Sequence, residues 1–411
     1  MIKYSRSNRL YNSTERYDVM IRGSKELIRN INCTNVLEEI INSEPISRAF
    51  LAKKLGLTKA TISSIVQELL NQKLILEIGS DETKFGRKPI LLSFNQKAGY
   101  AISIDLGDSI ISAALTDLKG EAAQYKSIQT PDDPKLILEN LVDLIQSMEQ
   151  LTSNSIFGIV GITIGIHGVV HLNKITYSEH ASPATDISNI DLINELEKIF
   201  HIPVIIENEA NLSAIGEYTF KSTYENIASL NIHSSISLGM VLRNTLYTGN
   251  NGYAGSCGHM IVVPDGRKCS CGNHGCLEQY LSIPSLLKDY GEKIHVPGVK
   301  LDDLFQAYEY KEPVAIEVID QFVKYASIAI NNVLNVYNPD YLVLNCALTK
   351  RFPSLLGKIQ NVLTCDLGTQ KKIVASSLNN SVLYGGICVA VREFLHMNHF
   401  IEFDESSSYS M

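Results

Sequence analysis

The chain has 411 residues, more than one ordinary domain needs, so two to three domains are expected. Hydrophobic residues make up 45% and charged residues 19%, as in a soluble globular protein with an ample core. No run approaches the roughly 20 apolar residues that span a bilayer, and no apolar signal-peptide core follows the polar first residues. These features exclude a membrane partner and predict a cytoplasmic protein.

The net charge of −8 is unevenly distributed. Residues 1–97 hold 16 Lys and Arg against 10 Asp and Glu, a balance of +6, and the remainder holds 20 against 34, a balance of −14. A basic end on an acidic body favours a polyanionic partner for the N-terminal part alone. Modest charge differences between domains are also common, so charge does not separate the two interpretations.

Two short helices are expected first in the N-terminal part. One covers Asn35–Asn42, where Asn35 and Glu38 have the spacing of a capping box. The next begins after Ser47 and ends at Gly56. Its expected buried residues are Phe50, Leu51 and Leu55.

A third helix follows a turn at residues 56–58, with Thr58 as its N-cap, and runs to about Leu70. Its apolar residues have the helical spacing i, i+3, i+4 and i+7: Ile62, Ile65, Val66 and Leu69. The opposite face carries short polar or basic side chains suited to a major groove: Lys59, Thr61, Ser63, Ser64 and Gln67.

Two strand-like runs, Leu74–Ile78 and Ile90–Phe94, flank a basic hairpin tip. At this tip Arg87 or Lys88 could enter a minor groove. The order of helix, helix, turn, helix and wing predicts a winged helix-turn-helix that binds a double-stranded DNA operator, with Ser47 as a further contact. The alternative is a small helical protein-interaction module with solvated lysines.

From Gly99 onward, strands alternate with helices, which predicts an α/β architecture with mostly buried sheets. The segment Asp105-Leu106-Gly107 is expected to turn a carboxylate toward a cleft, although Asp and Gly also make ordinary turns. The expected strands are Tyr100–Leu106, Ser109–Asp117, Ile159–Ile166, Pro203–Ile206 and Tyr341–Leu344. The expected helices are Leu136–Met148, Asn208–Glu217 and one that carries an apolar stripe from Ile319 to Val333.

The strongest local signal is a cluster of metal-binding residue types: His259, Cys269, Cys271 and Cys276. One imidazole and three thiolates suit tetrahedral Zn²⁺, and a full shell of protein ligands indicates a structural ion. Gly272 and Gly275 permit the tight chain reversal that the cluster needs. Cys257 and His274 are alternative ligands, and reduced cysteines in a loop are the alternative to a metal site.

Five segments carry a family resemblance. They are PISRAFLAKKLGLTKATISSIVQELL at 45–70, GRKP at 86–89, FNQKAGYAISIDLG at 94–107, IENEAN at 206–211 and CSCGNHGCLE at 269–278. In these segments the chain resembles the ROK family of repressors, open reading frames and kinases, most closely its xylose-repressor branch. The resemblance implies a winged-helix DNA-binding domain on an actin-like, ribonuclease-H-like body of two lobes, assembled as a homodimer or homotetramer.

The resemblance also implies a division of the chain. Residues 1–97 form the winged helix-turn-helix, 98–225 the first ROK lobe, completed by about 372–401, and 226–371 the second lobe with the zinc motif. For the sugar pocket it implies Asn208, Glu209, His259 and Glu278 as residues that bind hydroxyl groups. A family Glu is replaced here by Ser256, and a substrate-loop Asn is replaced within Ser182–Asp186. The expectation is a small-molecule sugar effector, with a vestigial pocket as the alternative.

The kinase residues of the family are less well matched. Kinase members have an Asp as general base at the position of Glu209, whose stem is longer by about one methylene. Serines replace two glycines of the phosphate loop within His233–Gly239, and Asn345-Cys346 replaces a later Gly-Gly. We therefore expect no catalytic residues and a transcriptional repressor of carbohydrate-utilisation genes, with sugar kinase activity as the alternative.

Overall fold

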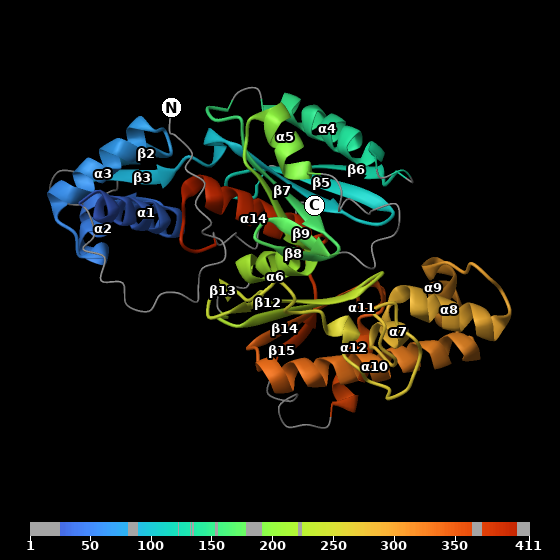
Figure 1. Cartoon of the computed structure of the whole chain (residues 1–411). Helices are drawn as coiled ribbons and strands as arrows, with labels where there is room; N and C mark the ends of the chain where they lie inside the picture. The colour runs from blue at the N-terminus through green and yellow to red at the C-terminus, as the bar shows by residue number, and fades with distance from the viewer. Residues whose placement is uncertain are drawn as a thin grey trace.

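The computed structural model describes residues 25–80, 89–121, 123–131, 133, 135–152, 155–177, 191–220, 224–363 and 372–400. Figure 1 shows three parts: an N-terminal module, a first lobe beside it, and a second lobe below. Helices α6 (Glu209–Phe220) and α14 (Ser381–Leu395) lie at the centre, where the three parts approach one another. None of the described helices is long and apolar enough to cross a membrane.

The N-terminal module comprises residues 25–80 and 89–94. Its helices are α1 (Lys25–Ser43), α2 (Arg48–Leu55) and α3 (Lys59–Asn71). Its antiparallel sheet has the order β1-β3-β2, from β1 (Ile46–Ser47), β3 (Ile90–Phe94) and β2 (Ile75–Ser80). The expected order of helices, turn and strands is confirmed, and it is compatible with a winged helix-turn-helix.

Local capping explains where α2 and α3 begin and end. The Ser47 hydroxyl accepts a hydrogen bond from the Phe50 amide at 3.3 Å, and Gly56 ends α2 with a φ of 65°. The Thr58 hydroxyl likewise accepts from the Thr61 amide at 3.1 Å. The predicted apolar stripe of α3 is buried: Ile62, Ile65, Val66 and Leu69.

Two expectations for this module are wrong. Helix α1 begins at Lys25, so Asn35 and Glu38 lie inside it and form no capping box. The start was missed because the apolar side chains of the first turns are exposed and give no core-facing period: Leu27, Ile28 and Ile31. Phe50, expected to be buried, is 53% exposed because it lies on the outer side of α2.

The first lobe has a five-stranded sheet of order β10-β7-β4-β5-β6. Its strands are β4 (Tyr100–Leu106), β5 (Ile110–Asp117), β6 (Gln124–Gln129), β7 (Ile159–Ile166) and β10 (Val204–Asn208). The first three are antiparallel, whereas β7 and β10 run parallel to β4. Helices α4 (Lys135–Glu149) and α5 (Leu192–Phe200) cover one face, and β8 (Val169–His171) pairs with β9 (Lys174–Tyr177).

The second lobe repeats this strand order as β13-β12-β11-β14-β15. Its strands are β11 (Ile227–Ile232), β12 (Ile236–Leu242), β13 (Thr245–Leu246), β14 (Tyr341–Cys346) and β15 (Lys372–Ala375). Its helices are α7 (Glu278–Leu281), α8 (Ile283–Ile294), α9 (Leu301–Glu309), α10 (Pro313–Tyr337), α11 (Ala347–Arg351) and α12 (Ser354–Val362). Two lobes with the same mixed sheet agree with the expected ribonuclease-H-like body.

Glycines allow α6 and α14 to cross in close contact. A Cβ on Gly385 of α14 would lie 1.8 Å from the Leu212 carbonyl oxygen of α6. A Cβ on Gly216 of α6 would lie 2.1 Å from the Ser381 carbonyl oxygen, and one on Gly386 would lie 2.0 Å from Ser103 Oγ of β4. Because real Cβ atoms do not approach other atoms so closely, these positions need glycine.

This crossing predicts the effect of one methyl group. Gly385→Ala pushes a Cβ into backbone, so we expect a loss of roughly 1–3 kcal/mol of stability and a thermal midpoint several degrees lower. Gly357→Ala in α12 is the matched control, because nothing lies within 4 Å of its Cβ position and alanine favours helix. Calorimetry of both variants checks this, and an unchanged midpoint for Gly385→Ala would contradict it.

Candidate functional site

The outward face of α3 carries most of the predicted DNA-contacting residues. Lys59, Ser63, Ser64 and Gln67 are exposed, and the Gln67 amide donates to Asn71 Oδ1 at 3.0 Å. The half-buried Thr61 side chain lies 2.9 Å from the hydroxyl of the N-cap Thr58. Ser47 is used as the N-cap of α2. Arg87 and Lys88 lie outside the described residues.

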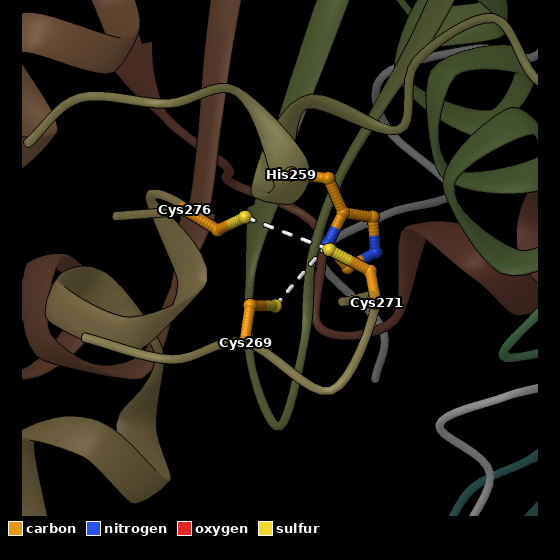
Figure 2. A group of neighbouring side chains, drawn as sticks. All are labelled: His259, Cys269, Cys271 and Cys276. Atoms are coloured by element: carbon orange, nitrogen blue, oxygen red, sulfur yellow. Dashed lines mark hydrogen bonds between the residues drawn. The ribbon is translucent and has the colours of Figure 1, made fainter. Parts of the chain in front are cut away.

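The predicted metal ligands converge, as Figure 2 shows. Their candidate ligand atoms all lie within 4.8 Å of one another: His259, Cys269, Cys271 and Cys276. Cys269 Sγ is 3.7 Å from His259 Nδ1, and Cys271 Sγ is 3.6 Å from Cys276 Sγ. Metal–sulfur bonds of about 2.3 Å in a tetrahedron give ligand separations of roughly 3.8 Å. The group therefore has the composition and dimensions of a four-ligand metal site.

The alternative ligands lie outside this group. His274 is exposed in the loop, and its backbone pairs with Lys268. Cys257 is buried, and this burial together with the Glu209 and Glu278 carboxylates raises the pKa of its thiol to about 12. Cys257 thus lies on the side of the predicted sugar pocket.

The loop that carries the cysteines is fixed by a tight turn at Gly275 and by the contacts of Arg267. Gly275 has a φ of 80°, and a Cβ there would lie 1.7 Å from the Val263 carbonyl oxygen. Arg267 donates to the Gln279 carbonyl at 2.8 Å, lies over the Tyr280 ring and forms a 2.9 Å ion pair with Asp289 of α8. Sequence reasoning identified the glycine but missed the arginine, whose partners are set by tertiary contacts.

Asn208 and Glu209 are placed by the start of α6. Asn208 Oδ1 accepts from the amides of Ala210 at 2.9 Å and Asn211 at 3.2 Å, so this residue caps the helix. Glu209 is only 3% exposed, and its Oε1 accepts a 2.5 Å hydrogen bond from the hydroxyl of Ser237 in β12. Its second oxygen, Oε2, is buried and has no hydrogen-bond partner among the described residues.

Glu278 lies beside the residue that precedes His259. Glu278 is 9% exposed, and its Oε2 lies 3.3 Å from the position of a Cβ on Gly258, the residue before His259. The charges of Glu209 and Glu278 both contribute to the raised pKa of the Cys257 thiol, so both carboxylates lie near this residue. The expected Ser182–Asp186 substitution lies outside the described residues, and the Ser256 hydroxyl donates to the Tyr253 carbonyl at 3.0 Å.

Two histidines near this region were missed by sequence reasoning. His167 Nε2 lies 3.5 Å from Asp105 Oδ1. Burial alone would lower the pKa of His167, but the Asp105 and Glu209 carboxylates outweigh it and raise the pKa to about 9. Burial, reinforced by the charge of His167, lowers the pKa of His233 to about 4. Single histidines in turns carry no pattern that reveals such partners.

The raised pKa of His167 predicts a pH dependence of stability. Its stabilising charge is fully present below pH 6.5 and is lost as pH rises through about 9. We expect the wild-type thermal midpoint to fall over this range relative to that of His167→Gln. His201→Asn, an exposed change at a φ of 56°, should instead follow the wild type. Parallel curves for wild type and His167→Gln would contradict the assignment, whereas His233 titrates below this range.

Comparison with known proteins gives consistent matches. The model of the ROK family matches residues 101–392. The xylose repressor of Bacillus spizizenii is 34% identical, with 90% of this chain and 97% of that protein aligned. The xylose repressor of Bacillus subtilis is 32% identical with the same coverage.

Solved structures agree with these matches. A ROK family transcriptional regulator, described as a homologue of the Escherichia coli MLC protein, is 25% identical with a TM-score of 0.73, covering 90% of this chain and 97% of its own. A ROK family glucokinase from Streptomyces griseus has a TM-score of 0.63 at 21% identity, covering 71% and 99%. The latter likeness concerns the fold alone. From the sequence match and the two-lobed actin-like fold together, we conclude that this chain belongs to the ROK family.

Proposed function

We propose that this protein is a DNA-binding repressor of carbohydrate-utilisation genes whose hold on DNA is controlled by a sugar effector. The observation that carries the proposal is the likeness to xylose repressors over 90% of the chain, a larger share than the 71% that aligns with the glucokinase structure. Xylose is therefore the first effector to test.

For the DNA-binding part, we propose that residues 1–97 form a winged helix-turn-helix. Helix α3 would enter the major groove, because its apolar side is buried and its polar side is exposed. The proposed contacts are Ser47, Lys59, Thr61, Ser63, Ser64, Gln67, Arg87 and Lys88. A homodimer or homotetramer would hold two such helices about one DNA turn apart.

The body is proposed to bind the effector between its lobes, 98–225 with about 372–401 and 226–371. The proposed contacts are Asn208, Glu209, His259 and Glu278. The buried Oε2 of Glu209 supports this, because an unpaired buried acceptor costs about 1–3 kcal/mol and a sugar hydroxyl could donate to it. A vestigial pocket remains the alternative, with Ser256 as the motivating substitution.

Kinase activity is not part of the proposal. Ser237, one of the serines in the altered phosphate loop, donates its hydroxyl hydrogen to Glu209 at the family's general-base position. Gly239, the glycine retained there, lies in β12, where a Cβ would be 1.8 Å from the Ala210 carbonyl oxygen. Close packing against α6 is therefore enough to require a glycine at this position.

A structural Zn²⁺ is proposed at His259, Cys269, Cys271 and Cys276. Four protein ligands leave no open position, so the ion would supply no reactive water and would act by fixing the loop. Fixing this loop would orient His259 and Glu278, which lies two residues after Cys276.

The central test is binding to the DNA upstream of the protein's own gene, followed by fluorescence anisotropy with and without xylose or glucose. We expect nanomolar binding, on the order of 10⁻⁸ M, and at least a tenfold loss of affinity with one of the sugars. Absence of specific DNA binding would refute the repressor, and binding that no sugar alters would refute the effector site.

Two lysine variants control this test. Lys59→Ala removes a proposed phosphate contact at the start of α3, so affinity should fall and the slope of log K against log salt should weaken by about 0.9 per contact. Lys288→Ala removes another exposed charge, from α8 in the second lobe, and it should leave both quantities unchanged.

The metal proposal predicts one zinc per chain by elemental analysis of the purified protein. Cys271→Ser should lose the metal and with it the response to the effector, because the loop that carries Glu278 loses its anchor. Cys33→Ser in α1 is the matched control and should keep both. A Cys271→Ser protein with full zinc content would contradict the ligand assignment.

A further inference from the structure

One carboxylate of α1 binds the chain just beyond α14. Glu38 Oε1 accepts hydrogen bonds from the backbone amides of Asn398 at 2.8 Å and His399 at 3.4 Å. One turn earlier on α1, the Thr34 hydroxyl donates to the His396 carbonyl at 3.5 Å. These contacts join the N-terminal module to the end of a helix of the body, as their positions in Figure 1 suggest.

A second carboxylate, just after α1, binds the first lobe. Glu44 Oε2 accepts from Ser93 Oγ and from the Phe94 amide, both at 2.5 Å, within the module. Its Oε1 pairs with Lys119 in the turn between β5 and β6. The two side chains are only 16% and 22% exposed, so solvent screens this pair less than an ordinary surface ion pair.

Apolar packing accompanies the polar contacts made by Glu38 and Glu44. One continuous core cluster includes Ile40 and Phe94 of the module, Leu118 beside Lys119, and Ile387 of α14. Elsewhere at the same junction, an open cavity of about 270 Å³ lies between β2 and Ile156 of the first lobe. The module is thus attached to the body by two polar contacts and a shared apolar core, and the junction is open beside β2.

The contact at Glu38 is mechanically linked to the proposed effector site. Helix α6 begins with Glu209 and crosses α14 at Gly385, where no space remains between the helices. Because closely packed helices move as units, a shift of α6 on effector binding would carry α14 with it. The chain segment that Glu38 binds follows directly from α14.

We propose that Glu38 and Glu44 are positioning residues that set the orientation of the N-terminal module on the body and transmit the effector's state to it. Neither acts on DNA or on the effector directly. The transmission rests on the proposed repressor function, whereas the positioning does not. If both side chains only stabilised the fold, their loss would lower stability and leave the response to effector intact.

Matched variants separate these roles in the full-length protein. Glu38→Ala and Lys119→Met each remove one contact between module and body. Glu39→Ala and Lys54→Met are the controls, because Glu39 and Lys54 form a 2.7 Å ion pair confined to the module. Glu38→Gln keeps a carbonyl oxygen that can accept from the two amides, so it should recover part of the wild-type behaviour.

The first readout needs neither DNA nor sugar. Hydrogen exchange at the amides of Asn398 and His399 should accelerate at least tenfold in Glu38→Ala and stay at the wild-type rate in Glu39→Ala. Unchanged exchange in Glu38→Ala would overturn the positioning role.

The second readout is the ratio of the DNA dissociation constants with and without D-xylose, using the protein's own upstream DNA. We expect this ratio to fall toward one by at least fivefold in Glu38→Ala and Lys119→Met, and to stay within twofold of wild type in the controls. A wild-type ratio in both variants, despite accelerated exchange, would overturn the transmission. If wild-type protein binds no DNA, the proposed function fails and the transmission with it, while the exchange data still decide the positioning role.

Discussion

The crossing of α6 and α14 is the contact on which the rest of the structure depends. Backbone touches backbone there, since a Cβ at Gly385 would lie 1.8 Å from the Leu212 carbonyl oxygen. One helix begins with Glu209 and the other leads to the segment that Glu38 binds. Each helix also has a second close packing partner: α6 lies against β12, and α14 lies against β4. Because the α6–α14 crossing has no free volume, a displacement of one lobe would be passed on to the N-terminal module with little loss.

The candidate metal ligands lie in the loop that leads to Glu278 of the proposed effector site. Its loop has little secondary structure of its own, and side chains in such a loop are poorly fixed unless something anchors them. Four candidate ligand atoms within 4.8 Å, with Arg267 tying the loop to Asp289, supply that anchor. The candidate ligand His259 directly follows Gly258, where a Cβ would lie 3.3 Å from the Glu278 carboxylate. The proposed metal site and the proposed sugar site would thus be coupled through this short stretch of chain.

The proposed regulatory role of a kinase-like body can be compared with what catalysis needs. Catalysis requires a base with a free lone pair at a fixed distance and a loop of backbone amides around phosphate. In this chain one oxygen of the carboxylate at the base position accepts a hydrogen bond from Ser237 and the other has no partner among the described residues, whereas Gly239 and Gly385 lie in close backbone contacts. The polar groups suited to hydroxyl recognition are retained, and such groups can read a ligand without transforming it. The raised pKa of His167 and the lowered pKa of His233 add two differently charged imidazoles beside that region.

The sequence by itself determined the features that depend on near neighbours along the chain. The buried stripe and caps of α3 follow from helical spacing and from Thr58, and the metal cluster follows from a short loop that three cysteines share. Tertiary structure decided the features whose partners are remote. Glu38 has the spacing of a capping box, but its oxygen accepts from Asn398, 360 residues away. In the sequence Gly385 is only a residue that weakens a helix, and its close contact with Leu212 is visible only in the folded chain. Local patterns report backbone propensity and burial, whereas a hydrogen bond or a close crossing between distant segments has no periodic signature, and only the folded chain shows it.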